Sequence, residues 1–227
     1  MTDTTSTSRV SITQLILVPS LITLAVTLLR LIGELQHWST RLFNPEAGGF
    51  GSIVGITWLA PIFGIYFALR LAKSGQGPER RGRAILFGVA GIVVVILVSV
   101  IAFALKANQY GQLIAFCVSF MLAALVQYPA WPALFKTLLA YAFAARIPVA
   151  ILMFFAMKGD WHTHYDVAPP DMPAEMSQFW PKYIWLAFLP QIFAWTGFTV
   201  LMGSLFGSIA TAISRRRPNP EPRAPSV

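Results

Sequence analysis

The stretch AILFGVAGIVVVILVSVIAFAL, residues 84–105, decides the fold class of this protein. It contains no charged residue and is rich in Val, Ile, Leu and Ala. A helix needs about 20 consecutive apolar residues to cross the hydrocarbon core of a bilayer. The stretch therefore predicts a transmembrane helix. Its uniformly apolar character indicates a helix that faces lipid and carries no functional site.

The composition extends this prediction to the whole chain. Of the 227 residues, 56% are hydrophobic and 11% are charged, whereas about a quarter of residues are charged in a soluble domain. We expect an all-α, polytopic membrane protein with a single domain of six transmembrane helices at 11–33, 51–72, 84–105, 111–128, 132–157 and 182–213. Residues 1–10 and 214–227 are expected to form tails, the second one basic, proline-rich and disordered.

Lysine and arginine residues predict the orientation of these helices. They concentrate in the two tails and in the loop at 73–83, while most acidic residues fall in the loops of the opposite side. The positive-inside rule then places both termini in the cytoplasm, in a multi-pass protein of the inner (plasma) membrane. The net charge of +8 is explained by this topology, so no nucleic acid is expected as a partner. Anionic lipids are the partners expected at the basic loop and tail.

Arg30 and Glu34 are spaced i,i+4 and share one face of the first predicted helix. Arg146 lies deeper, about 21 Å from the start of its helix at 1.5 Å per residue. Such a charge either snorkels to the interface or faces the interior of the bundle. If Arg146 faces inward, we expect Glu34 as its counter-charge and Gln191 as a hydrogen-bond partner, in a cavity in the outer half of the bundle.

Glycines precede the second predicted helix at Gly48, Gly49 and Gly51. They allow close backbone approach, and the N-terminus of a helix attracts anions, so this turn is a candidate cradle for a carboxylate, phosphate or lipid headgroup. The alternative is an ordinary turn before a helix. The GxxxG pairs Gly51/Gly55 and Gly203/Gly207 instead predict close helix packing.

His162 and His164 are candidate metal ligands, because two histidines one residue apart can bind Zn²⁺ or Cu²⁺ from an extended segment. Neither HExxH nor CxxC accompanies them, and an exposed polar loop is the alternative. The single cysteine, Cys117, excludes an intramolecular disulfide. No cofactor is expected.

Three classes of function fit these patterns. The first is a small transporter or channel-like protein that binds an anionic or amphipathic solute through Arg30, Glu34, Arg146 and Gln191. The second is a non-catalytic subunit or assembly factor, with membrane proteins or a second copy of the chain as partners. The third is an intramembrane enzyme that acts on lipid. No catalytic motif supports an enzyme, since no GxSxG elbow is present.

Overall fold

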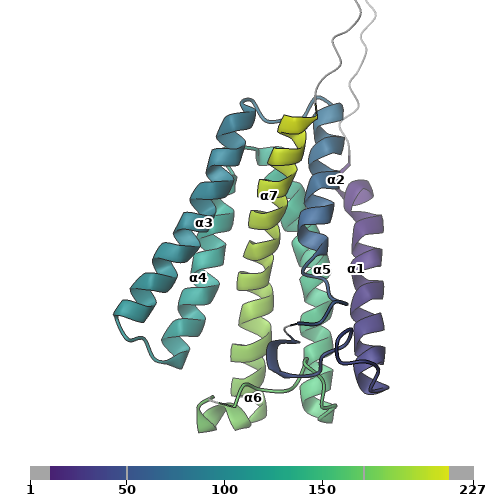
Figure 1. The fold of residues 1–227 in the computed structure, drawn as a ribbon, viewed down its shortest axis with the longest axis vertical. Coiled ribbons are helices and arrows are strands. Elements are labelled where there is room, and N and C mark those ends of the chain that lie inside the picture. Colours follow the sequence, from purple (N-terminus) through teal and green to yellow (C-terminus); the bar gives the residue numbers. More distant parts are fainter. Residues whose placement is uncertain (1–10, 50, 171, 215–227) are drawn as a thin grey trace, which may run out of the picture.

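The computed structural model describes residues 11–49, 51–170 and 172–214, which form a helical bundle without strands (Figure 1). The helices are α1 (Ile12–Leu35), α2 (Leu59–Lys73), α3 (Arg81–Ala104), α4 (Gln109–Gln127), α5 (Pro132–Gly159), α6 (Phe179–Lys182) and α7 (Thr196–Ile213). Two π-helical segments, η3 (Tyr183–Phe188) and η4 (Pro190–Trp195), join α6 to α7 as one long helix. Short 3₁₀ turns occur at Ala47–Gly49 (η1) and Ala174–Ser177 (η2). The two predicted tails lie outside the described residues, apart from Ser214.

The prediction of an all-α fold is confirmed, and in the described residues five helices are long and apolar enough to cross a membrane. The predicted helix at 51–72 is too long, because α2 begins only at Leu59 and has 15 residues. At 1.5 Å per residue α2 is about 22 Å long, less than the roughly 30 Å core of a bilayer.

Segment 51–58 is not helical because its backbone pairs with an earlier part of the chain. The amides of Ile53 and Val54 donate to the carbonyls of Arg41 and Leu42. The Ser52 hydroxyl also donates to the Leu42 carbonyl. These bonds replace the i→i+4 bonds of a helix, so an apolar stretch that resembles a helix start is held as a loop beside the bundle.

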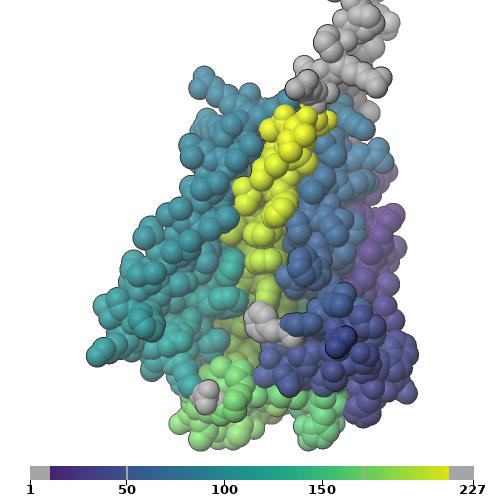
Figure 2. All heavy atoms as spheres, in the orientation of Figure 1, coloured from purple at the N-terminus to yellow at the C-terminus, as the bar shows by residue number. Residues whose placement is uncertain are grey.

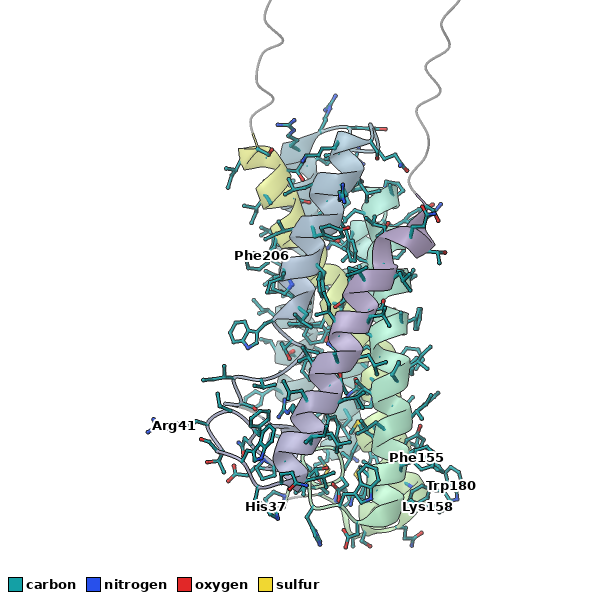
Figure 3. All side chains as sticks on the ribbon, turned by 90° about the vertical axis from the view of Figure 1, so that its right-hand side faces the viewer. His37, Arg41, Phe155, Lys158, Trp180 and Phe206 are labelled. Atoms are coloured by element: carbon teal, nitrogen blue, oxygen red, sulfur yellow. The ribbon has the colours of Figure 1, made fainter. Side chains whose placement is uncertain are left out.

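Helix α7 lies at the centre of the bundle and contacts α2, α3, α4 and α5, while α1 packs on α5. Figure 2 shows α7 between the α3–α4 pair and α2. The first described turn of α1 and the last turn of α7 lie at the same end of the bundle, here called the terminal end (Figure 1). Segments 36–58 and 160–178 lie at the opposite end, the loop end, where Figure 3 shows His37, Arg41 and Lys158.

Glycines bring α2 and α7 into close contact. A Cβ atom on Gly64 would lie 2.3 Å from the Cα atom of Gly203, and one on Gly207 would lie 2.7 Å from the Gly64 carbonyl oxygen. The close packing predicted from the Gly203/Gly207 spacing is therefore present. Gly55 lies with Gly51 in the loop 51–58, so that pair makes no helix–helix contact of this kind.

The core lies along α5, and the outer helices expose apolar surface. Tyr141 of α5 is 1% exposed, and its hydroxyl is hydrogen-bonded to Thr23 of α1 at 2.7 Å. Helix α3, in contrast, exposes large apolar side chains along its length, including Leu86, Ile96, Val100 and Phe103. Water does not favour so extended an apolar surface, and α3 is among the helices that are long and apolar enough to cross a membrane.

Candidate ligand-binding cavity

A cavity of about 390 Å³ lies inside the bundle near its loop end. Its walls come from α1, the segment 48–58, α5, the loop after α5, the π-helical segments, and α4 through Leu113. Most of the lining is apolar, from side chains such as Val149, Met153 and Met157 of α5. A few polar side chains also line the cavity, among them Thr27, Arg30, Ser52, Arg146, His164 and Gln191. A mostly apolar cavity with a few convergent polar groups is the usual form of a small-molecule site.

Arg146 faces this cavity from the middle of α5 and does not snorkel to an interface. The residue is 4% exposed, and its guanidinium carbon lies 5.3 Å from the centre of the Trp195 ring. Its Nε atom is buried and has no hydrogen-bond partner in the part of the chain that the structure describes. Every ion pair in the described residues has Glu34 or Asp160 as its acidic partner, and none includes Arg146. The cation–π contact with Trp195 supplies part of the missing stabilisation.

Gln191 lies on the same cavity as Arg146, but the two side chains are not hydrogen-bonded in the described structure. The Gln191 Nε2 amide donates weakly to the Met153 sulfur at 3.6 Å, and its Oε1 atom is buried without a partner. Gln191 belongs to η4, where the Thr196 hydroxyl donates to the Gln191 carbonyl five residues back. Such π-helical turns occur frequently at functional sites.

Glu34 pairs with Arg30 and His164 and does not pair with Arg146. Arg30 Nε donates to Glu34 Oε1 at 2.9 Å, as the i,i+4 spacing predicts. The His164 backbone amide donates to Oε2 at 3.0 Å, and the ring Nδ1 lies 2.6 Å from Oε1 and 2.7 Å from Oε2. No ion pair joins Glu34 to Arg146 in the described residues, so the expected contact is absent. Glu34 is 2% exposed and lies behind the wall that Arg30 and His164 make.

The titration of His164 is dominated by its burial. Removal from water lowers the pKa of the imidazole below its ordinary value of 6.5, although the hydrogen bond that the ring makes to Glu34 opposes this shift. His164 is therefore a neutral ring that donates its Nδ1 proton to the ionised Glu34. Burial likewise raises the pKa of the neighbouring Tyr165 phenol, whose hydroxyl donates to the Thr27 carbonyl. Arg30, Glu34 and His164 together are close to electroneutral, and the charge of Arg146 remains uncompensated.

The glycines line the cavity but do not open a helix, so that part of the prediction is wrong. Gly48, Gly49 and Gly51 all have positive φ, and α2 begins later, at Leu59. The carbonyl of Gly49 accepts a hydrogen bond from Arg30 Nη2 at 3.1 Å. A Cβ atom at Gly49 would collide with Arg30 and with the His164 ring. Glycine is required there because backbone and side chains meet closely, and the turn offers Arg30 a carbonyl.

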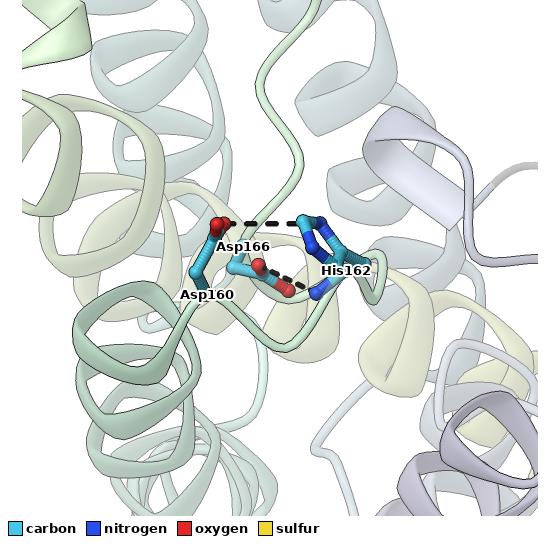
Figure 4. Close-up of side chains that lie close together, drawn as sticks. All are labelled: Asp160, His162 and Asp166. Carbon is cyan, nitrogen blue, oxygen red and sulfur yellow. Dashed lines mark hydrogen bonds and ion pairs between the residues drawn. The ribbon is translucent and has the colours of Figure 1, made fainter.

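The predicted metal pair His162 and His164 does not converge on one point. His164 is directed to Glu34, whereas the side chain of His162 is 78% exposed and lies 3.8 Å from Asp160. Figure 4 shows His162 together with Asp160 and Asp166, whose potential ligand atoms lie within 4.8 Å of one another. Asp166 already accepts the His162 amide and both the amide and hydroxyl of Thr163. Its carboxylate closes the loop, which accounts for the cluster without a metal.

We compared the chain with models of protein families, with curated proteins and with solved structures, and no match was found in any of them. The geometry of the cavity is thus the basis for assigning a function.

The structure gathers most of the predicted site residues around a single cavity. Arg30, Arg146, Gln191, the three glycines and His164 line it, Glu34 supports it from behind, and His162 lies outside. The sequence reasoning missed Trp195 and Met153 as partners of Arg146 and Gln191. Trp195 follows Gln191 by four residues, so helical spacing alone would have placed both on one face.

Proposed function

We propose that this chain is an integral membrane protein that binds an anionic, amphipathic solute in the cavity beside Arg146, as a small transporter or carrier does. The observation that carries the proposal is the buried guanidinium of Arg146, which among the described residues has no carboxylate partner and whose Nε atom has no hydrogen-bond partner. Desolvating a cation costs several kcal/mol, and proteins normally recover that cost by pairing it. A bound anion supplies the missing charge and accepts hydrogen bonds from the guanidinium, for which a carboxylate or phosphate is the best geometric match.

The remaining polar groups refine the type of ligand. Gln191 Oε1 is an acceptor without a partner, so it can receive a hydrogen bond from a hydroxyl or amide of the ligand. Arg30 is fixed by Glu34 and by two backbone carbonyls, those of Asn44 and Gly49, so it forms a rigid part of the wall whose charge Glu34 neutralises. The apolar walls from α5 and the π-helical segments suit the hydrocarbon part of an amphipathic molecule.

We further infer that six segments cross the inner (plasma) membrane, with both termini in the cytoplasm and the loop end outside. Five apolar helices and the exposed apolar face of α3 support insertion. Lys73, Arg81 and Arg83 lie at the terminal end, which is the side that the positive-inside rule assigns to the cytoplasm. Loop 51–58 together with α2 makes the second crossing, since non-helical backbone is tolerated where it lines a cavity.

Binding is tested by thermal unfolding of the purified protein in detergent with added hexanoate, and with 1-hexanol as the uncharged comparison. We expect hexanoate to raise the melting temperature of the wild type, because a ligand that binds only the folded state stabilises it. The variant Arg146→Gln should lose this shift. Lys158→Gln removes the same charge from an exposed position on α5 and should retain it. An equal hexanoate shift in Arg146→Gln, or none in the wild type, overturns the proposal.

The orientation is tested separately in a Cys117→Ser background. Glu175→Cys at the loop end and Glu79→Cys at the terminal end both lie at exposed positions. We expect a membrane-impermeant maleimide to label Glu175→Cys in intact cells and Glu79→Cys only after the cells are permeabilised. The reverse pattern rejects the assigned orientation and leaves the binding site unaffected.

A further inference from the structure

A second hollow lies directly beside the cavity, on the outer surface of the bundle. It is a groove of about 380 Å³ between α4 and the π-helical segments, and its lining is almost wholly apolar. Residues from Leu113 to Leu122 form one wall, and residues from Trp185 to Phe193 form the other. The α4 residues 113, 114, 117, 118, 121 and 122 follow helical periodicity, so they make one continuous stripe.

The groove and the cavity share a thin wall. Leu113 lines both of them. On the π-helical segments, Leu186 and Pro190 line the cavity, while their sequence neighbours Trp185 and Leu189 line the groove. The groove is open on its outer side, where Val118 is 43% exposed. At 1.5 Å per residue, the stripe from 113 to 122 extends about 14 Å along α4.

We propose that the anionic solute is a lipid-like molecule whose hydrocarbon chain lies in this groove while its acidic headgroup binds Arg146. The inference rests on the proposed function of the cavity and specifies its ligand as a long-chain carboxylate or a lipid with an acidic headgroup. Leu113 borders both hollows, so a molecule that displaces this one side chain reaches both sites. The open outer side of the groove admits the chain laterally from the bilayer.

The charges support a lipid over a small water-soluble anion. Arg146 supplies one cationic anchor in the cavity, and the groove supplies apolar surface on the other side of Leu113. A small anion would bind Arg146 but would not extend into the groove. A chain in the groove exchanges contacts with the bilayer for contacts with α4 and the π-helical segments. Its headgroup gains an ion pair with Arg146, which the hydrocarbon of the bilayer cannot provide.

The inference is tested by comparing hexanoate with dodecanoate as ligands of the wild type and of Val118→Trp, which fills the groove. The matched control is Val100→Trp, at an exposed position of α3 away from both hollows. In detergent the chain leaves one apolar surrounding for another, so it gains only the van der Waals contacts that the groove walls add, each of them small. We therefore expect Val118→Trp to weaken dodecanoate binding about threefold or more and hexanoate binding less than twofold. Partition of dodecanoate into detergent is the same for all three proteins, so it cancels in the comparison.

A second measurement reports where the chain lies, whether or not Val118→Trp folds. Dodecanoate brominated at its terminal carbon should quench tryptophan fluorescence in the wild type, and Trp185→Phe should lose a large part of that quenching. Two outcomes reject the groove while the proposed function stands. In the first, hexanoate binds through Arg146 but Val118→Trp weakens the binding of both carboxylates equally. In the second, quenching in Trp185→Phe is the same as in the wild type. Failure of both carboxylates to bind through Arg146 rejects the proposed function and the groove together.

Discussion

The carboxylate of Glu34 and the residue His164, 130 positions apart in the chain, are joined by two hydrogen bonds. One comes from the His164 backbone amide and the other from its ring Nδ1. The pair ties the last turn of α1 to the loop after α5, and both elements carry groups that line the cavity. Its integrity therefore decides whether Arg30 and the glycine turn keep their positions.

Neutralising Glu34 should destabilise the loop end. Glu34→Gln leaves Arg30 without its counter-charge in a buried setting, which we expect to cost about 3 kcal/mol. For a chain of this length that corresponds to a melting temperature lower by about 10 °C. The matched control is Glu46→Gln, an exposed carboxylate in the same connection, which should change the stability by less than about 0.5 kcal/mol. Equal melting temperatures for Glu34→Gln and Glu46→Gln would contradict the importance of the buried pair.

The stability should depend on pH through His164. Its pKa is lowered in the folded state, so the unfolded chain binds a proton more readily. The free energy of unfolding should then fall as the pH drops below the ordinary value of 6.5 toward the lower pKa of the folded state. His164→Gln should flatten this dependence, and His162→Gln, an exposed neighbour, should leave it intact. A pH profile of His164→Gln that follows the wild type would show that another group is responsible.

Arg146 should limit the stability of the empty protein. Replacing a buried, unpaired cation by an apolar side chain of similar length removes its desolvation cost. We expect Arg146→Met to leave the melting temperature without ligand unchanged, or to raise the free energy of unfolding by about 1 kcal/mol after loss of the Trp195 contact. The same variant should lose the hexanoate-induced shift. A marked destabilisation would mean that Arg146 is a structural residue.

The contact between α2 and α7 should not tolerate a methyl group. A Cβ atom at Gly64 meets the backbone of Gly203, which cannot rotate away. We expect Gly64→Ala to lower the stability by about 1–3 kcal/mol through overpacking. Gly82→Ala is the matched control, because nothing lies within 4 Å of its added Cβ atom and alanine favours the first turn of α3. The ranking of the two variants is measured by thermal unfolding, and a more stable Gly64→Ala would contradict the close packing.

Much of the secondary structure could be predicted from the chain alone, because a long apolar run has few alternatives to a helix. The break between the helices predicted at 111–128 and 132–157 and the i,i+4 pair of Arg30 and Glu34 followed from local rules in the same way. The start of α2 did not follow. Residues 51–58 are as apolar as a helix start, but their hydrogen bonds go to Arg41 and Leu42, and composition carries no information on such pairing.

The sequence by itself determined the helical class, the apolar faces and the short list of charged residues that have to be accommodated among them. Only the tertiary structure decided which of these charges are paired. Glu34 had three possible basic partners, and the fold gave its two oxygens to Arg30 and His164, so that Arg146 was left facing the cavity alone. The reason is physical: a carboxylate buried at one point can satisfy only the groups that the fold brings within hydrogen-bond distance, and that distance depends on the packing of segments far apart in the chain.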